Sequence, residues 1–227
     1  MGSNPVGVFT PQATERFGIM TQSSASNALK LLALLSMFLL AGCAGSSSYM
    51  SDVPPERANY TTQADQALVV FMRPSGFGFA IQSSVFDIVD ENPVFVGIVS
   101  AKAKVAYYVN PGERRFMVIS ESADFMDATL EAGKVYYALV TPRMGVWKAR
   151  FSLRPVRKAD LESAEFAGWY KQTRWVENLD SASAWASSNM ASIRAKMNNK
   201  LPGWQQKANK PTLASDDGLG EPYQPPG

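Results

Sequence analysis

The sequence contains the stretch Lys104-Val-Ala-Tyr-Tyr-Val-Asn-Pro-Gly-Glu-Arg-Arg-Phe-Met-Val-Ile119, in which two apolar runs flank a proline-glycine turn. Each run has the length of a strand and is rich in β-branched and aromatic residues, which favour strands over helices. A proline followed by a glycine is typical of a turn. This stretch therefore predicts two consecutive strands with a tight connection.

The same pattern continues on both sides of this stretch, with a hairpin turn expected at residues 90–93. Short apolar runs separated by turn residues are expected to form strands at residues 67–73, 85–89, 94–99, 104–109, 114–119, 128–130, 135–140 and 145–153. Evenly spaced short strands without intervening helices are typical of a sandwich or a small barrel. We expect an all-β fold, a compact β-sandwich of about seven to eight short strands, over residues 66–158.

The pattern changes after residue 158, where Asp160 and Asp180 are candidate N-caps of helices. An apolar stripe with spacings of three and four follows, made of Ala182, Ala186, Met190, Ile193 and Met197. We expect a helical C-terminal extension over residues 159–203, broken at Leu201-Pro202-Gly203, whose stripe packs on the β domain. A partner-binding or membrane-surface helix is the alternative.

Two polar segments flank these regions. Residues 43–65 contain Pro54-Pro55 and show no apolar periodicity, so they are expected to form a flexible tether. Residues 204–227 are rich in proline, glycine and acidic side chains, which predicts a disordered tail.

The N-terminal region indicates where the protein resides. Lys30 precedes ten uncharged apolar residues, 31–40, which are too few for a membrane-spanning helix of about 20 residues. A basic residue, a short apolar run and small residues at its end are typical of a secretory signal. We expect residues 1–42 to be a signal peptide, with either Met1 or Met20 as its start.

The end of this apolar run, Leu40-Ala41-Gly42-Cys43, resembles the lipobox of bacterial lipoproteins. The resemblance implies that the Cys43 thiol is acylated, with palmitate among the chains, and that Cys43 becomes the mature N-terminus. Because Ala44 rather than Asp follows it, the resemblance also implies the outer membrane, with the protein facing the periplasm. An ordinary secretory signal with a chance Cys, or a short membrane anchor, is the alternative.

Composition narrows the possible chemistry. The 227 residues include one Cys and no His, with a net charge of +2. The absence of His excludes a Ser-His-Asp triad and a His-bearing metal site, and a single Cys excludes an intrachain disulfide. The acidic residues lie in or beside expected turns, which favours solvation over paired-carboxylate catalysis. We expect no catalytic residues, no cofactor, no metal site and no nucleic-acid partner.

Residues 132–159 contain no acidic side chain, although seven basic residues lie there. In the last expected strand, Trp147, Ala149, Phe151 and Leu153 alternate with Lys148, Arg150, Ser152 and Arg154. This period of two directs the apolar side chains to the core and the basic row, defined as Lys148, Arg150 and Arg154, outward. The row is either a solvated, edge-protecting face or an anion-facing stripe.

Three segments, 107–113, 130–137 and 150–156, place a proline-glycine turn, an alanine-glycine turn with paired tyrosines, and a basic strand in that order. Together with the lipobox, this order resembles an uncharacterised family of small proteobacterial lipoproteins with a domain of unknown function. The resemblance implies a PEGA-like or transthyretin-like β-sandwich and no assigned activity.

These observations predict a bacterial cell-envelope lipoprotein that is not an enzyme but a binding or scaffolding module. Its expected partners are the membrane, through the lipid anchor, and an envelope protein or peptidoglycan. An accessory subunit of an envelope secretion or transport complex is the first alternative, and a hydrolase of envelope polymers is the second.

Overall fold

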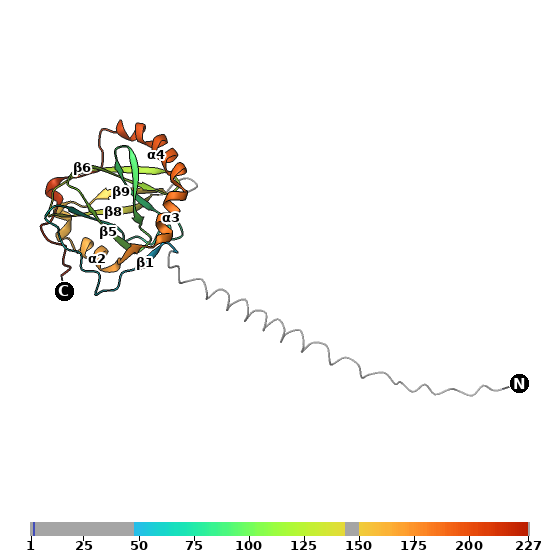
Figure 1. Cartoon of the computed structure of the whole chain (residues 1–227). Helices are drawn as coiled ribbons and strands as arrows, with labels where there is room; N and C mark the ends of the chain where they lie inside the picture. The colour runs from blue at the N-terminus through green and yellow to red at the C-terminus, as the bar shows by residue number, and fades with distance from the viewer. Residues whose placement is uncertain (1, 3–47, 144–149, 227) are drawn as a thin grey trace. The chain divides into compact units, whose positions relative to one another are not determined.

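A computed structural model describes Gly2 and residues 48–143 and 150–226. The signal peptide, Cys43, Lys148 and the first residues of the last expected strand lie outside the described residues. The chain divides into two compact units, Met1–Gly45 and Ser46–Gly227. The expected β-rich fold is confirmed, because the described part of the second unit consists mainly of eleven strands in two mixed sheets, with three α-helices (Figure 1).

The first sheet has six strands in the order β1-β10-β5-β2-β8-β9. Their bounds are Met50–Asp52 for β1, Ala67–Arg73 for β2, Ala103–Val109 for β5, Val135–Arg143 for β8, Arg150–Pro155 for β9 and Arg174–Asn178 for β10. β2 lies in the middle, antiparallel to β5 and parallel to β8. Every residue of β2 is buried, as expected for a strand whose sheet is covered on both faces.

The second sheet has five strands in the order β11-β7-β6-β3-β4. Their bounds are Ser84–Val89 for β3, Asn92–Ile98 for β4, Gly112–Ile119 for β6, Ala123–Leu130 for β7 and Thr212–Leu213 for β11. The expected hairpin between β3 and β4 is confirmed, and Asp90 and Glu91 both adopt positive φ, as a two-residue hairpin turn requires. The turn after β5 instead carries the chain from the first sheet to the second.

The main core lies between the inner faces of the two sheets. Phe71 of β2 and Phe116 of β6 contact each other edge to face across it, with ring centroids 5.1 Å apart. Alternate residues of β9 also point into this core, where Phe151 and Leu153 are buried. The two sheets therefore form one packed body.

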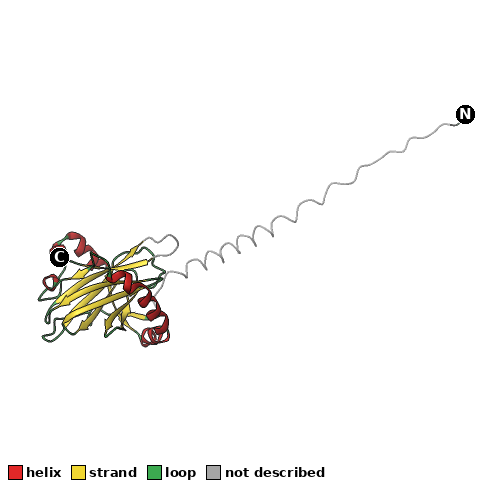
Figure 2. Cartoon of the chain, turned by 90° about the horizontal axis from the view of Figure 1, so that it is seen from above, coloured by secondary structure: helices red, strands yellow, loops and turns green. Residues whose placement is uncertain are grey.

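Helices cover the outer faces of the sheets (Figure 1). The 3-10 helix η1, Lys158–Glu162, and α2, Ala164–Gln172, cover the first sheet, where Phe166 packs on Tyr137. α3, Asp180–Ser188, and α4, Met190–Gln205, cover the second sheet. Figure 2 shows helices crossing over the strands. The expected packing of the apolar stripe on the β domain is confirmed, because Ala182, Ala186, Ile193 and Met197 are buried.

The expected break at residues 201–203 is wrong, since α4 continues through Pro202 to Gln205. Proline removes one helical hydrogen bond, but Pro202 lies on the exposed side of the helix. The extra turn places Trp204 against Phe125 of β7, with ring centroids 5.6 Å apart. Burial of the indole favours continuation of the helix.

Residues 43–65 were expected to form a flexible tether, but the structure is folded from residue 49 onward. β1 pairs with β10, Val53 N–H donates to the Trp175 carbonyl at 3.0 Å, and Tyr60 packs on Trp175 at 4.5 Å. A three-residue edge strand has no periodicity of its own, so the sequence pattern did not reveal it. Most of the expected tether is therefore part of the folded unit.

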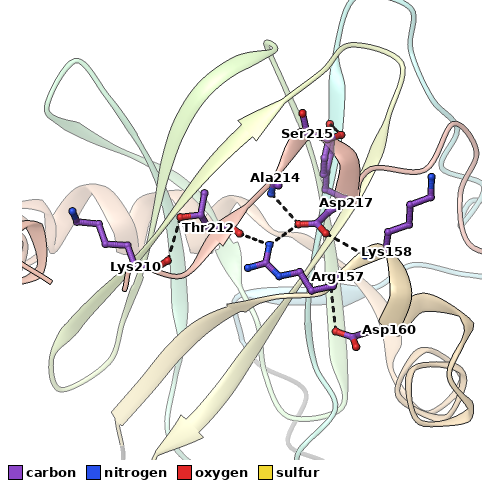
Figure 3. A network of polar contacts seen from close by, with 9 residues as sticks. Arg157, Lys158, Asp160, Lys210, Thr212, Ala214, Ser215 and Asp217 are labelled. Atoms are coloured by element: carbon purple, nitrogen blue, oxygen red, sulfur yellow. Dashed lines mark hydrogen bonds and ion pairs between the residues drawn. The ribbon is translucent and has the colours of Figure 1, made fainter. Parts of the chain in front are cut away.

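The expected disordered tail also differs from the structure, which packs residues 204–226 against the sheets. Leu213 is buried in β11, and Asp217 is only 5% exposed. The Asp217 carboxylate accepts hydrogen bonds from Arg157 at 2.8 Å and from the Ala214 backbone N–H at 2.9 Å (Figure 3). One buried carboxylate and one buried leucine thus hold a segment whose overall composition is typical of disorder.

Candidate functional site

Two members of the basic row, Arg150 and Arg154, lie on β9 and point outward as the alternation predicted, whereas Lys148 lies outside the described residues. Arg150 and Arg154 are exposed, while Phe151 and Leu153 between them are buried. The Arg154 guanidinium lies over the Trp169 ring of α2, 5.2 Å from its centroid. Arg150 instead lines a pocket, so the two side chains belong to different surroundings.

The pocket that Arg150 lines has a volume of about 310 Å³. It lies where the C-terminal part of α4 meets the ends of β7, β8 and β9. We call it the cationic pocket, because its lining includes one carboxylate and four cationic side chains, which are Arg143, Arg150, Lys200 and Lys207.

The single carboxylate of the cationic pocket, Asp124, is 8% exposed and is shared by two of the cations. Its Oδ2 accepts a hydrogen bond from Arg143 Nη2 at 3.0 Å, and its Oδ1 lies 3.6 Å from Lys207 Nζ. Within residues 48–143 and 150–226, Arg150 and Lys200 form no ion pair. The pocket therefore has an excess of positive charge.

Neutral hydrogen-bonding groups complete the lining. Ser122 and Asn199 supply a hydroxyl and an amide, and Trp204 forms part of the wall. The Trp204 side chain is almost fully buried, and its indole N–H has no hydrogen-bond partner in the described part of the chain. Cations, amides and hydroxyls around one cavity are groups that bind a carboxylate or a phosphate.

A second pocket, of about 360 Å³, lies between the start of β3, the turn after β6 and the α3–α4 junction. Its lining includes Trp185, Asn189 and one residue of each charge, Lys196 and Glu121. Lys196 Nζ donates to the Ser120 carbonyl at 2.6 Å. This pocket has no excess charge and does not share the chemistry of the cationic pocket.

Lys104 is a buried cation with a structural role. Its Nζ donates to the carbonyls of Tyr170 and Thr173, each at 2.8 Å, and lies 3.8 Å from the centroid of the Tyr170 ring. Burial lowers the pKa of Lys104 to about 8. The ammonium thereby caps the last carbonyls of α2 and ties this helix to β5.

Asp87 is the most enclosed carboxylate of the described residues, although the acidic residues were expected to be solvated in or beside turns. It accepts a hydrogen bond from the Tyr107 hydroxyl at 3.2 Å and lies 3.7 Å from Arg114. Burial raises the pKa of the Asp87 carboxyl, and it raises the pKa of Tyr107 to about 12. With 1% of its surface exposed, Asp87 is closed to a substrate and links β3, β5 and β6.

Across the described ranges, no group of three or more metal-ligating side chains converges. No helix in the same ranges is long and apolar enough to cross a membrane. In comparisons with known proteins, no protein-family model matches the chain, and no curated protein resembles it significantly. The function is therefore argued from the site itself.

Sequence reasoning found Arg150 but missed the residues that make it part of a pocket. Asp124, Lys200 and Lys207 are distant in sequence, and only the packing of α4 on β7 brings them to the end of β9. Arg143 carried a signal, because it belongs to the acid-free stretch. No pattern in the sequence connects that stretch to α4.

Proposed function

We propose that the protein is a bacterial cell-envelope lipoprotein that binds anionic groups without catalysis. Its fold would be a compact β-sandwich with a helical extension, anchored through acylated Cys43. The observation that supports binding is that Arg150 and Lys200 line a pocket of about 310 Å³ without an ion-pair partner among the described residues. An anionic ligand would supply the charge that the protein does not.

The size and chemistry of the cationic pocket favour a small anionic group. Pockets of ~300 Å³ are at the lower end of those that bind small ligands. Arg150 offers a planar fork suited to two oxygens of a carboxylate or phosphate, and Lys200 offers a point charge. Such a group occurs at the end of a lipid headgroup or a cell-wall peptide, which fits an envelope location.

Binding is favoured over hydrolysis because Asp124 is committed to ion pairs with Arg143 and Lys207. Both Asp124 oxygens already face a cation, so neither is free to take a proton from a substrate. A docking role for the C-terminal helices is also disfavoured, because their apolar stripe is buried against the second sheet. The hydrolase and the accessory subunit therefore remain secondary alternatives.

The proposed anchor would keep the domain near the membrane. Tyr49 already contacts the folded unit through its carbonyl, which accepts a hydrogen bond from Leu179 N–H at 2.9 Å. Six residue steps separate it from Cys43, and at 3.3–3.6 Å per step a fully extended chain reaches ~20 Å. The lipid would therefore hold the anion-binding domain within ~20 Å of its own attachment point.

Titration of the full chain with inorganic pyrophosphate tests anion binding, with intrinsic tryptophan fluorescence as the readout because Trp204 lines the pocket. We expect saturable binding that weakens as salt is added. The double variant Arg150→Glu, Lys200→Glu should bind about tenfold more weakly, because tenfold corresponds to ~1.4 kcal/mol, or ~0.7 kcal/mol for each partly exposed charge.

Arg154→Glu is the matched control, because Arg154 belongs to the same strand and the same basic row but lies outside the pocket. Its affinity for pyrophosphate should equal that of the parent chain. An equal loss in both variants would mean a general surface-charge effect, and an absence of binding in the parent chain would contradict the proposal.

A further inference from the structure

The loop between β2 and β3 exposes two aromatic side chains at its tip. Phe77 is 52% exposed and Phe79 is 79% exposed, more than any other large hydrophobic residue in the described ranges. A single exposed apolar residue is ordinary, whereas two on one loop form a local apolar patch. Such a patch indicates a surface that contacts another apolar surface.

The fully buried Arg73 side chain fixes the backbone of this loop through hydrogen bonds. Arg73 Nη2 donates to the carbonyls of Phe77 and Gly78, at 3.0 and 2.6 Å. Its Nη1 donates to the Ile81 carbonyl at 2.9 Å and to Ser83 Oγ at 3.1 Å. A guanidinium that binds three carbonyls and a hydroxyl orders the backbone, so the two Phe side chains project from a supported loop.

The same loop is connected to the cationic pocket through Arg73, while its residues 80–82 line the second pocket. The Arg73 guanidinium lies 4.3 Å from the centroid of the Phe151 ring, and Phe151 lines the cationic pocket. Arg73 ends β2, Arg143 ends the parallel strand β8, and Arg150 pairs with Arg143 at the start of β9. Exposed aromatic rings and unpaired cations thus occupy the same end of the first sheet.

We infer that this end of the domain rests on an anionic lipid bilayer, with Phe77 and Phe79 inserted among the lipids and the cationic pocket facing the headgroups. Aromatic side chains beside basic residues are the combination that binds a membrane interface. A bilayer is favoured over a protein partner because the proposed acyl anchor keeps Tyr49, at the start of the folded unit, within ~20 Å of lipid. The inference rests on the proposed function for that anchor and for anion binding by the cationic pocket.

The test uses two variants of the full chain, Phe79→Cys and Val94→Cys. Each variant is labelled with an environment-sensitive dye at the new Cys and mixed with phosphatidylethanolamine–phosphatidylglycerol vesicles. Val94 is the matched control, because it is 43% exposed and apolar but lies beside the β3–β4 turn, at the other end of the second sheet. The emission of the dye at position 79 should shift to the blue, and quenchers carried on the acyl chains should quench it severalfold more than the dye at position 94.

Equal emission and equal quenching at the two positions would overturn the inference. The parent chain has one Cys, so dye on the parent would report an unmodified Cys43 and thus a failure of the proposed acylation. In that case the pair is repeated with Cys43→Ser, and the same comparison of positions 79 and 94 decides the inference. Failure of the loop to insert while pyrophosphate still binds would leave the proposed function standing.

Discussion

Two buried cations, Arg73 and Lys104, have no carboxylate partner among the described residues, and each organises backbone instead. Arg73 supports the loop after β2, and Lys104 caps α2. Desolvation lowers the pKa of Arg73 to about 10 and that of Lys104 to about 8. Both groups thus carry the cost of a buried charge, which carbonyl hydrogen bonds offset in part.

The lowered pKa of Lys104 predicts how stability depends on pH. Above its folded pKa of about 8 and below its ordinary value of 10.5, the unfolded chain binds more protons than the folded chain at this site. The contribution of Lys104 to the free energy of unfolding should therefore rise by ~1.5 kcal/mol between about pH 8 and about pH 9.5. Urea denaturation across this range measures the effect.

Lys104→Met is the control for this titration, because it keeps an unbranched side chain and removes the ionisable group. The difference in free energy of unfolding between the parent chain and Lys104→Met should therefore grow by ~1.5 kcal/mol from about pH 8 to about pH 9.5. The measurement is a difference because five tyrosines with raised pKa values lower the stability of both chains as the unfolded tyrosines begin to ionise; these are Tyr60, Tyr107, Tyr136, Tyr137 and Tyr170. The same pH dependence in both chains would assign the effect to another group.

Among the elements, strands with an apolar pattern of their own could be predicted from the sequence, and β1, β10 and β11 could not. Strands β2 to β6, β8 and β9 overlap expected strands, whereas only the last three residues of β7 were expected. β10 lies inside the expected helical extension, which is wrong over residues 174–178. β1 and β11 have two or three residues each and form only because another strand offers them hydrogen bonds. Their existence depends on packing that no local pattern contains.

The C-terminal segment provides a test at the level of one element. Asp217→Ala removes the acceptor for Arg157 and for two backbone N–H groups (Figure 3). Loss of a buried carboxylate that accepts three hydrogen bonds costs ~1–3 kcal/mol, so residues 212–219 should open more readily. Hydrogen exchange measured by mass spectrometry should show about tenfold faster exchange in peptides covering this segment.

Asp216→Ala is the matched control, since Asp216 is the exposed neighbour of Asp217. Its exchange rates in residues 212–219 should equal those of the parent chain. Unchanged exchange in Asp217→Ala would contradict the view that one buried carboxylate holds the segment, and would assign its order to Leu213 and Leu219 instead.

The cationic pocket likewise combines one residue that a local sequence pattern predicts with others that only the packing of α4 brings to it. The alternation in β9 predicted that Arg150 points outward, because a strand has a period of two. The pocket exists only because α4 runs past Pro202 and brings Lys200, Trp204 and Lys207 to the ends of β7 and β9. The expected helix break at residues 201–203 would have removed one wall.

For the complete chain, the principal consequence of the structure is a shorter tether than the sequence indicated. Because residues from Tyr49 onward belong to the folded unit, an acyl group on Cys43 would hold the start of that unit close to lipid. A long tether would let the domain sample many orientations, whereas a short one favours lasting contact with the bilayer. The anchor thus favours membrane contact of the Phe77–Phe79 loop, whereas anion binding by the cationic pocket does not depend on it.

The most direct test of the account is the intact mass of the protein purified from bacterial envelopes after expression of the full chain. The account predicts a chain that begins at Cys43 and carries the added mass of a diacylglyceryl group, with a further acyl group on the new N-terminus. A chain that retains residues 1–42, or one with an unmodified Cys43 thiol, would contradict the account.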